Sequence, residues 1–255
     1  MAKTIAVTGK GGTGKTVVAA LIIKWLKQNA TGPILALDAD PDANLGTVLG
    51  IRAEKTIGDM REDTLKEIKN LPVGMSKSAY IEAGLHQIVD ENEKVDLITM
   101  GRGEGPGCYC YLNNLLRGFA DKLQASYEWV VMDNEAGLEH LSRRTASKIY
   151  RLFVIINENP LSIDCAERID RLVKELKNEI TGMYTIANSV NESQSKQLKE
   201  KIDRLRMKYL CFIPYDQKLE ELIFKRKSLF DLVNSEAFSK IDEIMRRLEK
   251  NNGGK

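Results

Sequence analysis

The chain has 255 residues, of which 43% are hydrophobic, and this composition allows one sizeable globular core. Its 38 basic and 36 acidic residues give a formal net charge of +2, so no dominant positive field favours nucleic acid as a partner. No stretch of the sequence has the length and apolarity of a membrane span or of a secretory signal peptide, and we therefore expect a cytoplasmic protein.

Short apolar runs alternate along the chain with segments of helical periodicity. The helical segments include residues 17–28, 162–179 and 238–250. Continuous apolar runs are typical of strands that are buried on both faces of a parallel sheet. The predicted strands cover residues 4–9, 33–40, 95–101, 128–133, 152–157, 184–190 and 209–215. This alternation predicts a single doubly wound α/β domain over residues 1–255, with a mostly parallel sheet and helices on both faces.

Three segments fit this alternation less well. Residues 51–93 are charged and only partly helical, and we expect an insertion there. Residues 101–110 form a loop that is rich in glycine and ends in two cysteines. The last five residues, NNGGK, are expected to fray.

The segment GKGGTGKT, at residues 9–16, has the spacing of a P-loop and stands between a predicted strand and a predicted helix. Its glycines allow backbone N–H groups to face a polyphosphate, and the helix N-terminus adds the positive end of its dipole. Lys15 is expected to reach the β- and γ-phosphates, and the Thr16 hydroxyl is expected to bind Mg²⁺. The predicted nucleotide-binding residues of the loop are Gly11, Gly12, Thr13, Gly14, Lys15 and Thr16.

Two acidic segments also follow predicted strands. In DADPDAN, Asp38 and Asp40 stand at the carboxyl end of a strand, where ligands bind in open α/β sheets. In WVVMDNEAG, four apolar residues lead to Asp133, which would hold Mg²⁺ through water as in a Walker B strand. Gly137 follows, where a backbone N–H can contact the γ-phosphate. The residues alone also allow Asp38 and Asp40 to be part of an acidic turn that caps the next helix.

The nucleotide base is expected to contact residues further along the chain. The Asn188 amide follows a predicted strand and can both donate and accept, which matches adenine. Guanine-binding loops usually carry Asp three residues later, where this chain has Asn191, so the sequence favours ATP over GTP. Pro214, Tyr215 and Asp216 end the next strand, where an ordinary turn is an equally good interpretation of each residue.

Cys108 and Cys110 are one residue apart and precede a predicted helix, whose N-terminus would favour the thiolate form. A closed Zn²⁺ site or a square-planar Ni²⁺ site takes four ligands, and two copies of this pair across a two-fold axis would supply them. A redox pair or an exposed pair without function is also compatible with the spacing. Structural roles are expected for Cys165, Cys211, His86 and His140.

The sequence KGGTGKT, from Lys10 to Thr16, resembles the deviant Walker A signature of the dimeric ATPases that include MinD, ParA, the arsenical pump ATPase and the nitrogenase iron protein. The resemblance implies that Lys10 crosses a dimer interface to the partner's phosphates, as an arginine finger does. It also implies that Asp40 positions the attacking water and that Asp38 supports the magnesium shell. By the same resemblance, Gly137 belongs to a switch and residues 214–216 close over adenine.

The Cys108–Cys110 pair, taken with DADPD and DNEAG, resembles the CooC-type ATPases, which serve nickel maturation of carbon monoxide dehydrogenase, and their relatives that serve acetyl-CoA synthase. The resemblance covers most of the chain. It implies a homodimeric Mg²⁺-ATPase that converts ATP to ADP and carries Ni²⁺, or Zn²⁺ in its place, to one of these two client enzymes. It assigns Lys10, Lys15 and Asp40 to catalysis.

Three other classes of protein share parts of this pattern. A MinD- or ParA-like positioning ATPase is one, but residues 238–250 carry acidic as well as basic residues, which favours packing on the sheet over membrane binding. An iron–sulfur reductase like the nitrogenase iron protein has its two cysteines far apart in sequence. A targeting ATPase for tail-anchored proteins has a C-x-x-C pair and a Met-rich groove, whereas the eight Met residues here are scattered.

Overall fold

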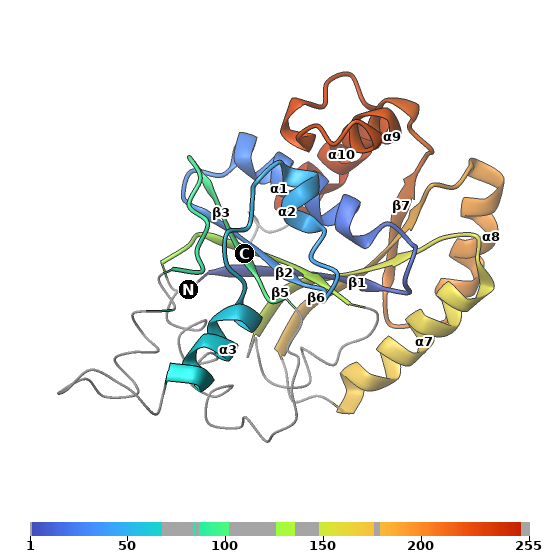
Figure 1. Ribbon diagram of the computed structural model, residues 1–255. Helices are drawn as coiled ribbons and strands as arrows, with labels where there is room; N and C mark the ends of the chain where they lie inside the picture. The colour runs from blue at the N-terminus through green and yellow to red at the C-terminus, as the bar shows by residue number, and fades with distance from the viewer. Residues whose placement is uncertain are drawn as a thin grey trace.

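A computed structural model describes residues 2–67, 84, 87–101, 126–135, 148–175 and 179–250 (Figure 1). Within these residues the chain forms a seven-stranded sheet in the order β3-β2-β4-β1-β5-β6-β7, and all neighbouring strands are parallel. The strands are β1 (Lys3–Gly9), β2 (Ile34–Ala39), β3 (Val95–Thr99), β4 (Trp129–Asn134), β5 (Lys148–Ile156), β6 (Glu179–Asn188) and β7 (Lys208–Ile213). Each predicted strand corresponds to one of them, so the predicted doubly wound α/β fold is confirmed.

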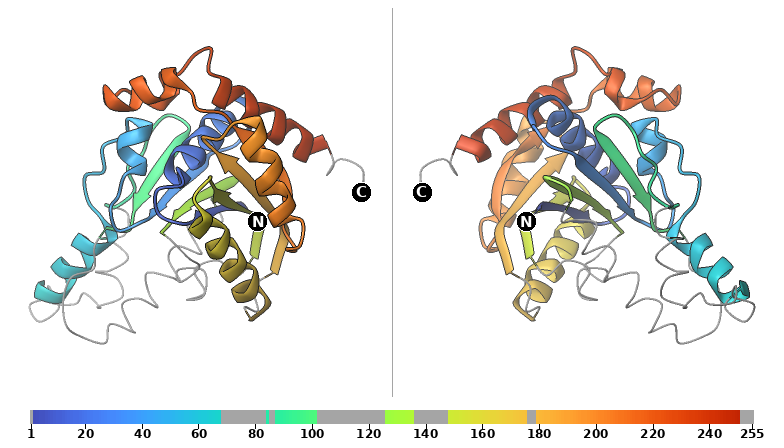
Figure 2. Two further views of the ribbon diagram at one scale, coloured as in Figure 1. Left: turned by 90° about the vertical axis from the view of Figure 1, so that its right-hand side faces the viewer. Right: turned by 90° about the vertical axis from the view of Figure 1, so that its left-hand side faces the viewer.

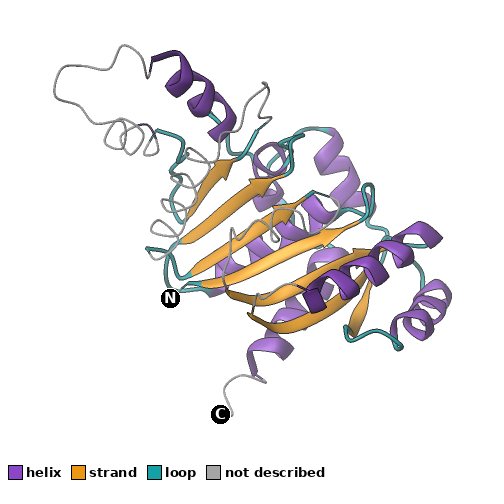
Figure 3. Cartoon of the chain, turned by 90° about the horizontal axis from the view of Figure 1, so that it is seen from below, coloured by secondary structure: helices purple, strands orange, loops and turns teal. Residues whose placement is uncertain are grey.

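Helices cover both faces of this sheet (Figures 1 and 3). One face carries α1 (Lys15–Asn29), α2 (Leu45–Leu49), α9 (Gln217–Phe224), the short 3₁₀ helix η1 (Leu229–Asp231) and α10 (Glu236–Lys250). The other face carries α3 (Ile57–Glu67), α7 (Pro160–Glu175) and α8 (Glu192–Ile202). Side chains alternate between these two apolar clusters along each strand, as the pleat of a sheet requires. The side views in Figure 2 show α9 and α10 on one side of the sheet and α7 on the opposite side.

The amphipathic C-terminal segment packs on the sheet, as predicted. In α10, Ile241, Ile244 and Met245 are buried in the cluster that α1 also enters. The guanidinium of the buried Arg151, on β5, lies 2.8 Å from Glu249 and donates a hydrogen bond of 3.0 Å to the Leu248 carbonyl. None of the described helices is long and apolar enough to cross a membrane.

The strand order reverses beside β1. From β1 the chain crosses to β2 and β3 on one side of the sheet, and it later builds β5, β6 and β7 on the other side. Ligands bind at the carboxyl ends of strands beside such a reversal. The ends of β1, β2 and β4 are therefore the place to look for a functional site.

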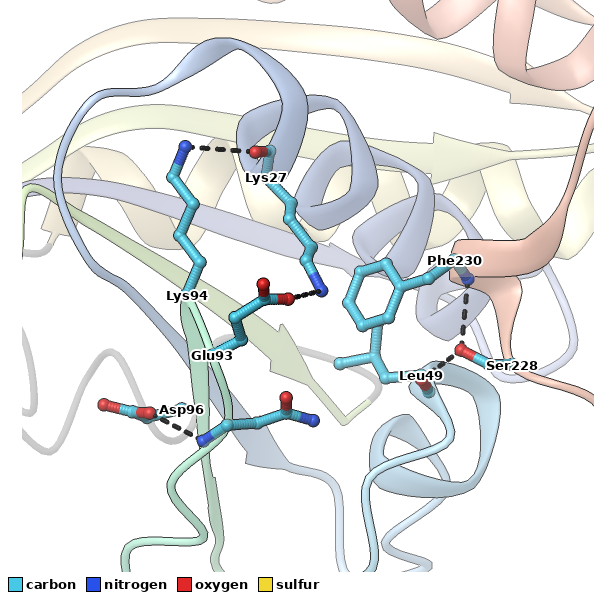
Figure 4. Close-up of polar contacts among 8 residues, drawn as sticks. Lys27, Leu49, Glu93, Lys94, Asp96, Ser228 and Phe230 are labelled. Atoms are coloured by element: carbon cyan, nitrogen blue, oxygen red, sulfur yellow. Dashed lines mark hydrogen bonds and ion pairs between the residues drawn. The ribbon is translucent and has the colours of Figure 1, made fainter.

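Helix α2 follows β2 and is fixed at its C-terminal end (Figure 4). The Ser228 hydroxyl donates a 2.6 Å hydrogen bond to the Leu49 carbonyl and accepts one of 3.2 Å from the Phe230 N–H. Figure 4 also shows the Lys94 ammonium, which donates a 3.1 Å hydrogen bond to the Lys27 carbonyl. The first two contacts join the end of α2 to η1, and the third joins the end of α1 to the residue that precedes β3.

The two described cysteines lie where the sequence predicts them, whereas the insertion expected at residues 51–93 stays a prediction. Cys165 is buried in α7, and Cys211 is half-buried in β7, where burial raises the pKa of its thiol to about 12. Of residues 51–93, the structure describes α3 and a few flanking residues. His86, Cys108, Cys110, Gly137 and His140 lie outside the described residues.

Candidate nucleotide site

The loop between β1 and α1 is a preformed turn. The Thr13 hydroxyl and N–H both donate to the Lys10 carbonyl, at 2.8 Å and 3.3 Å. Gly12 and Gly14 have φ angles of +80° and +84°, in the left-handed region that favours glycine. A Cβ atom added at Gly11 or Gly12 would meet nothing within 4 Å, so this side of the loop is open to a ligand.

Asn188 braces this loop from the end of β6. Its Nδ2 donates a 2.9 Å hydrogen bond to the Thr13 carbonyl, and a Cβ atom at Gly14 would lie 2.2 Å from Nδ2. Glycine at position 14 is therefore required by close packing as well as by its φ angle. The Asn188 amide keeps its second N–H and its oxygen for other partners, so its contact with adenine stays a prediction.

Asp38 lies at the end of β2 and is completely buried. One carboxylate oxygen accepts a 3.2 Å hydrogen bond from the Asp40 N–H, and the other accepts one of 2.8 Å from the Leu45 N–H. Burial raises the pKa of Asp38 to about 6, although both hydrogen bonds act in the opposite direction. Asp38 thus caps the start of α2 while it faces the site.

Asp133 is the register partner of Asp38 on β4 and is also completely buried. Burial raises the pKa of Asp133 to about 7; the Thr16 hydroxyl and Lys15 lower it, and the carboxylates of Asp38 and Asp40 raise it further. The Thr16 hydroxyl is close enough to act on this pKa, yet neither oxygen of Asp133 accepts a hydrogen bond of normal geometry from a described residue. Magnesium prefers carboxylate and hydroxyl oxygens, so Asp133 and Thr16 fit this ion.

The three remaining predicted catalytic groups lie at different depths. Lys15 is buried in the first turn of α1, within electrostatic reach of Asp133. Lys10 is half-exposed, and its ammonium makes a long 3.4 Å contact with the neighbouring Gly11 carbonyl. Asp40 is half-exposed in a turn, where it accepts a 3.0 Å hydrogen bond from the Asp42 N–H. The structure therefore shows that Asp40 lies in a turn, as the alternative interpretation of this segment expected. The catalytic role of Asp40 stays a prediction.

The predicted adenine loop, residues 214–216, precedes α9. The Tyr215 side chain is 62% exposed, so its ring is available for stacking. Asp216 accepts hydrogen bonds from the N–H groups of Lys218, Leu219 and Ala237 and from the Ser235 hydroxyl, at 2.6–3.2 Å. Although burial acts to raise it, these hydrogen bonds keep the pKa of Asp216 below its ordinary value. Asp216 therefore caps α9 and fixes the start of α10, a role that the sequence did not reveal.

The metal pair cannot be placed in this geometry, because residues 102–125 lie outside the described part of the chain. Among the described residues, no group of three or more His, Cys, Asp or Glu side chains could hold a metal ion. The binding of Ni²⁺ or Zn²⁺ by Cys108 and Cys110 stays a prediction.

The chain is similar to known proteins over most of its length. Residues 4–229 match the family model described as the CobQ/CobB/MinD/ParA nucleotide binding domain. The chain is 40% identical to an ATP-binding protein of Methanocaldococcus jannaschii, over 96% of this chain and 97% of that protein. It is 28% identical to the carbon monoxide dehydrogenase accessory protein CooC of Rhodospirillum rubrum, over 89% of each chain.

Solved structures show the same fold. The septum site-determining protein MinD of Pyrococcus horikoshii, solved with Mg-ADP, has a TM-score of 0.68 at 19% identity, over 99% of this chain and 98% of that one. A ParA family ATPase of Chlorobium tepidum also has a TM-score of 0.68, at 18% identity, over 95% and 96% of the two chains. Together with the match to the family model, this similarity shows that the chain belongs to the CobQ/CobB/MinD/ParA family of nucleotide-binding domains.

Proposed function

We propose that the protein is a Mg²⁺-dependent ATPase. The observation that carries this proposal is the pair of completely buried carboxylates, Asp38 and Asp133, beside the P-loop. Asp133, unlike Asp38, accepts no hydrogen bond of normal geometry from a described residue, and an ionised carboxylate buried in this way is costly unless a cation accompanies it. Asp133 and Thr16 would hold Mg²⁺, which supplies positive charge that offsets the charge of the phosphates.

The residues of the chain would carry the rest of the reaction. The open P-loop would direct its N–H groups at the phosphates, and Lys15 would stabilise the charge that develops on them. Asp40 would orient the attacking water and accept its proton. Lys10 would reach the phosphates of a partner subunit in a homodimer; its half-exposed position and its long contact with the Gly11 carbonyl are compatible with this role.

The finer proposal is that ATP hydrolysis serves nickel maturation. Cys108 and Cys110, paired across the homodimer, would bind Ni²⁺, with Zn²⁺ as the other soft metal that suits thiolates. The client would be carbon monoxide dehydrogenase or acetyl-CoA synthase. Two features support this proposal: the C-x-C spacing, and the similarity to CooC of Rhodospirillum rubrum along most of both chains.

Asp40→Asn tests the catalytic assignment. The variant should bind ATP as tightly as the wild type, because Asp40 is not assigned to binding, and its kcat should fall about 10²–10⁴-fold, the usual contribution of a general base. Asp42→Asn is the matched control, since Asp42 is an exposed carboxylate in the same turn. A wild-type kcat in Asp40→Asn would show that this residue is part of the turn and nothing more.

A further inference from the structure

Thr99, the last residue of β3, has a hydroxyl that is buried and has no hydrogen-bond partner in the part of the chain that the structure describes. The residue is 2% exposed, and among the described residues its Oγ1 has no hydrogen-bond partner. A buried hydroxyl that makes no hydrogen bond destabilises the fold. Valine has the same shape and a high preference for strands, so Val at this position would stabilise the fold more than Thr does. The hydroxyl is therefore a candidate for a functional contact.

The strand register places Thr99 in a polar row. Thr99 is the register partner of Asp38, and Asp38 is the register partner of Asp133. Two residues earlier on the same strands, Leu97, Ala36 and Val131 all belong to the apolar cluster beneath α1 and α2. Because side chains alternate along a strand, the three polar residues face the same side, where α1 carries the P-loop at its N-terminus. Adjacent strands are about 4.8 Å apart, so neighbours in the row are within reach of each other.

Unpartnered polar atoms gather at this edge of the sheet. The buried side-chain atoms without a hydrogen-bond partner among the described residues include Thr99 Oγ1, both carboxylate oxygens of Asp133 and Oδ1 of Asn134. All of them lie at the carboxyl ends of β3 and β4, on either side of β2. Thr99 thus shares the feature that marks Asp133 as a ligand-binding group.

The Asp38 carboxylate can accept further hydrogen bonds. Each of its oxygens accepts one backbone N–H, whereas a carboxylate offers about four acceptor positions. The Met100 N–H donates a 2.8 Å hydrogen bond to the Asp38 carbonyl, which fixes the end of β3 beside Asp38. Rotation about χ1 is the movement by which the Thr99 side chain would approach the carboxylate of its register partner.

We propose that Thr99 is a positioning residue of the ATP site. When Mg²⁺-ATP binds, the Thr99 hydroxyl donates a hydrogen bond to the Asp38 carboxylate and holds it in the orientation that supports the magnesium. This role rests on the proposed Mg²⁺-ATPase function and adds a group from β3, a strand that the sequence did not connect with the nucleotide. Loss of a hydrogen bond to a charged group should weaken the interaction about tenfold or more.

Two variants separate this role from a structural one. Thr99→Val removes the hydroxyl and keeps the shape, whereas Thr99→Ser keeps the hydroxyl and removes a methyl group. Binding of a fluorescent ATP analogue is measured while Mg²⁺ is titrated, and again in EDTA, and the melting temperature of each ligand-free protein is recorded. We expect Thr99→Val to melt at or above the wild-type temperature and to bind the analogue normally in EDTA. Its apparent Mg²⁺ affinity should fall about tenfold, and Thr99→Ser should restore it.

Three results would overturn the proposal. The first is a wild-type Mg²⁺ dependence in Thr99→Val, and the second is a defect in Thr99→Ser equal to that in Thr99→Val. The third is a Thr99→Val protein that melts well below the wild type, because the hydroxyl would then have a structural partner. If the wild type itself showed no Mg²⁺-dependent nucleotide binding, the Mg²⁺-ATPase function would fail together with this role; in the first two cases the role of Thr99 would fail alone.

Discussion

Asp133→Asn should stabilise the metal-free protein while it abolishes the Mg²⁺-dependent reaction. The Asp133 side chain is completely buried, and burial raises its pKa to about 7. An amide of the same shape carries no charge to desolvate, so the substitution removes the cost of burying an ionised group. The gain in stability should therefore exist only where the wild-type carboxyl is ionised.

The sign and size of this change in stability follow from the pKa of Asp133 in the unfolded and folded chain. The pKa of Asp133 is raised from 3.8 in the unfolded chain to about 7 in the folded protein, so ionisation destabilises the fold increasingly as pH rises from about 4 to about 7. This shift corresponds to about 4 kcal/mol at pH 8 and about 1–2 kcal/mol at pH 5. A buried amide has hydrogen-bonding needs of its own that cost about 1–3 kcal/mol. The net gain at pH 8 is then about 2 kcal/mol, or about 4–8 °C in melting temperature for a chain of this size.

Scanning calorimetry in EDTA, at pH 5 and pH 8, tests this expectation. Asp133→Asn should melt several degrees above the wild type at pH 8 and close to it at pH 5, and Mg²⁺ with ATP should stabilise the wild type alone. Asp164→Asn, which changes an exposed carboxylate on α7, is the control and should melt like the wild type at both pH values. A lower melting temperature for Asp133→Asn at pH 8, or an equal gain at both pH values, would refute the reasoning.

Two further predictions concern the proposed homodimer. Titration should give one Ni²⁺ per dimer, with an affinity that falls as pH falls because protons compete for the thiolates. Cys108→Ser/Cys110→Ser should lose this metal and Cys211→Ala should keep it, whereas two metals per dimer would contradict a bridging site. Lys10→Ala should bind nucleotide without hydrolysing it, and mixing it with Lys15→Ala should restore part of the activity in hybrid dimers. Absence of any rescue would count against a role in trans.

Local sequence patterns were enough to predict the strands and the P-loop. Apolar runs identify buried parallel strands, and glycine spacing identifies a phosphate loop, because both depend on neighbours in the chain. The sequence also indicated that Asp38 and Asp133 stand near the carboxyl ends of two predicted strands, which parallel packing brings to one edge of a sheet. That these two strands are neighbours, with Asp38 and Asp133 in register, is shown by the structure.

Long-range contacts were outside the reach of those patterns. Asn188 and Thr13 are 175 positions apart, and no local signal shows that the amide of one holds the carbonyl of the other. Similarly, the sequence around Thr99 indicates only that this residue belongs to a strand. The register of β3 against β2 shows that Thr99 lies beside Asp38. Both residues are polar groups at strand ends, and their roles depend on which strands become neighbours.

The polar row at the ends of β3, β2 and β4 gives a physical reason why bound nucleotide would stabilise the protein. A ligand changes the populations of two conformations only by as much as its binding free energies to those conformations differ. Buried groups whose hydrogen-bonding capacity is unused destabilise the ligand-free protein, and a bound cation and nucleotide would supply the missing partners. Among the described residues of the row, Asp133 and Thr99 carry these unpartnered atoms, and the side chain of Asp38 lies between them in the register. Asp38 holds the N–H of Leu45 at the start of α2, and Ser228 holds the carbonyl of Leu49 at its end. The two ends of α2 thus connect the candidate site to the residues that precede η1.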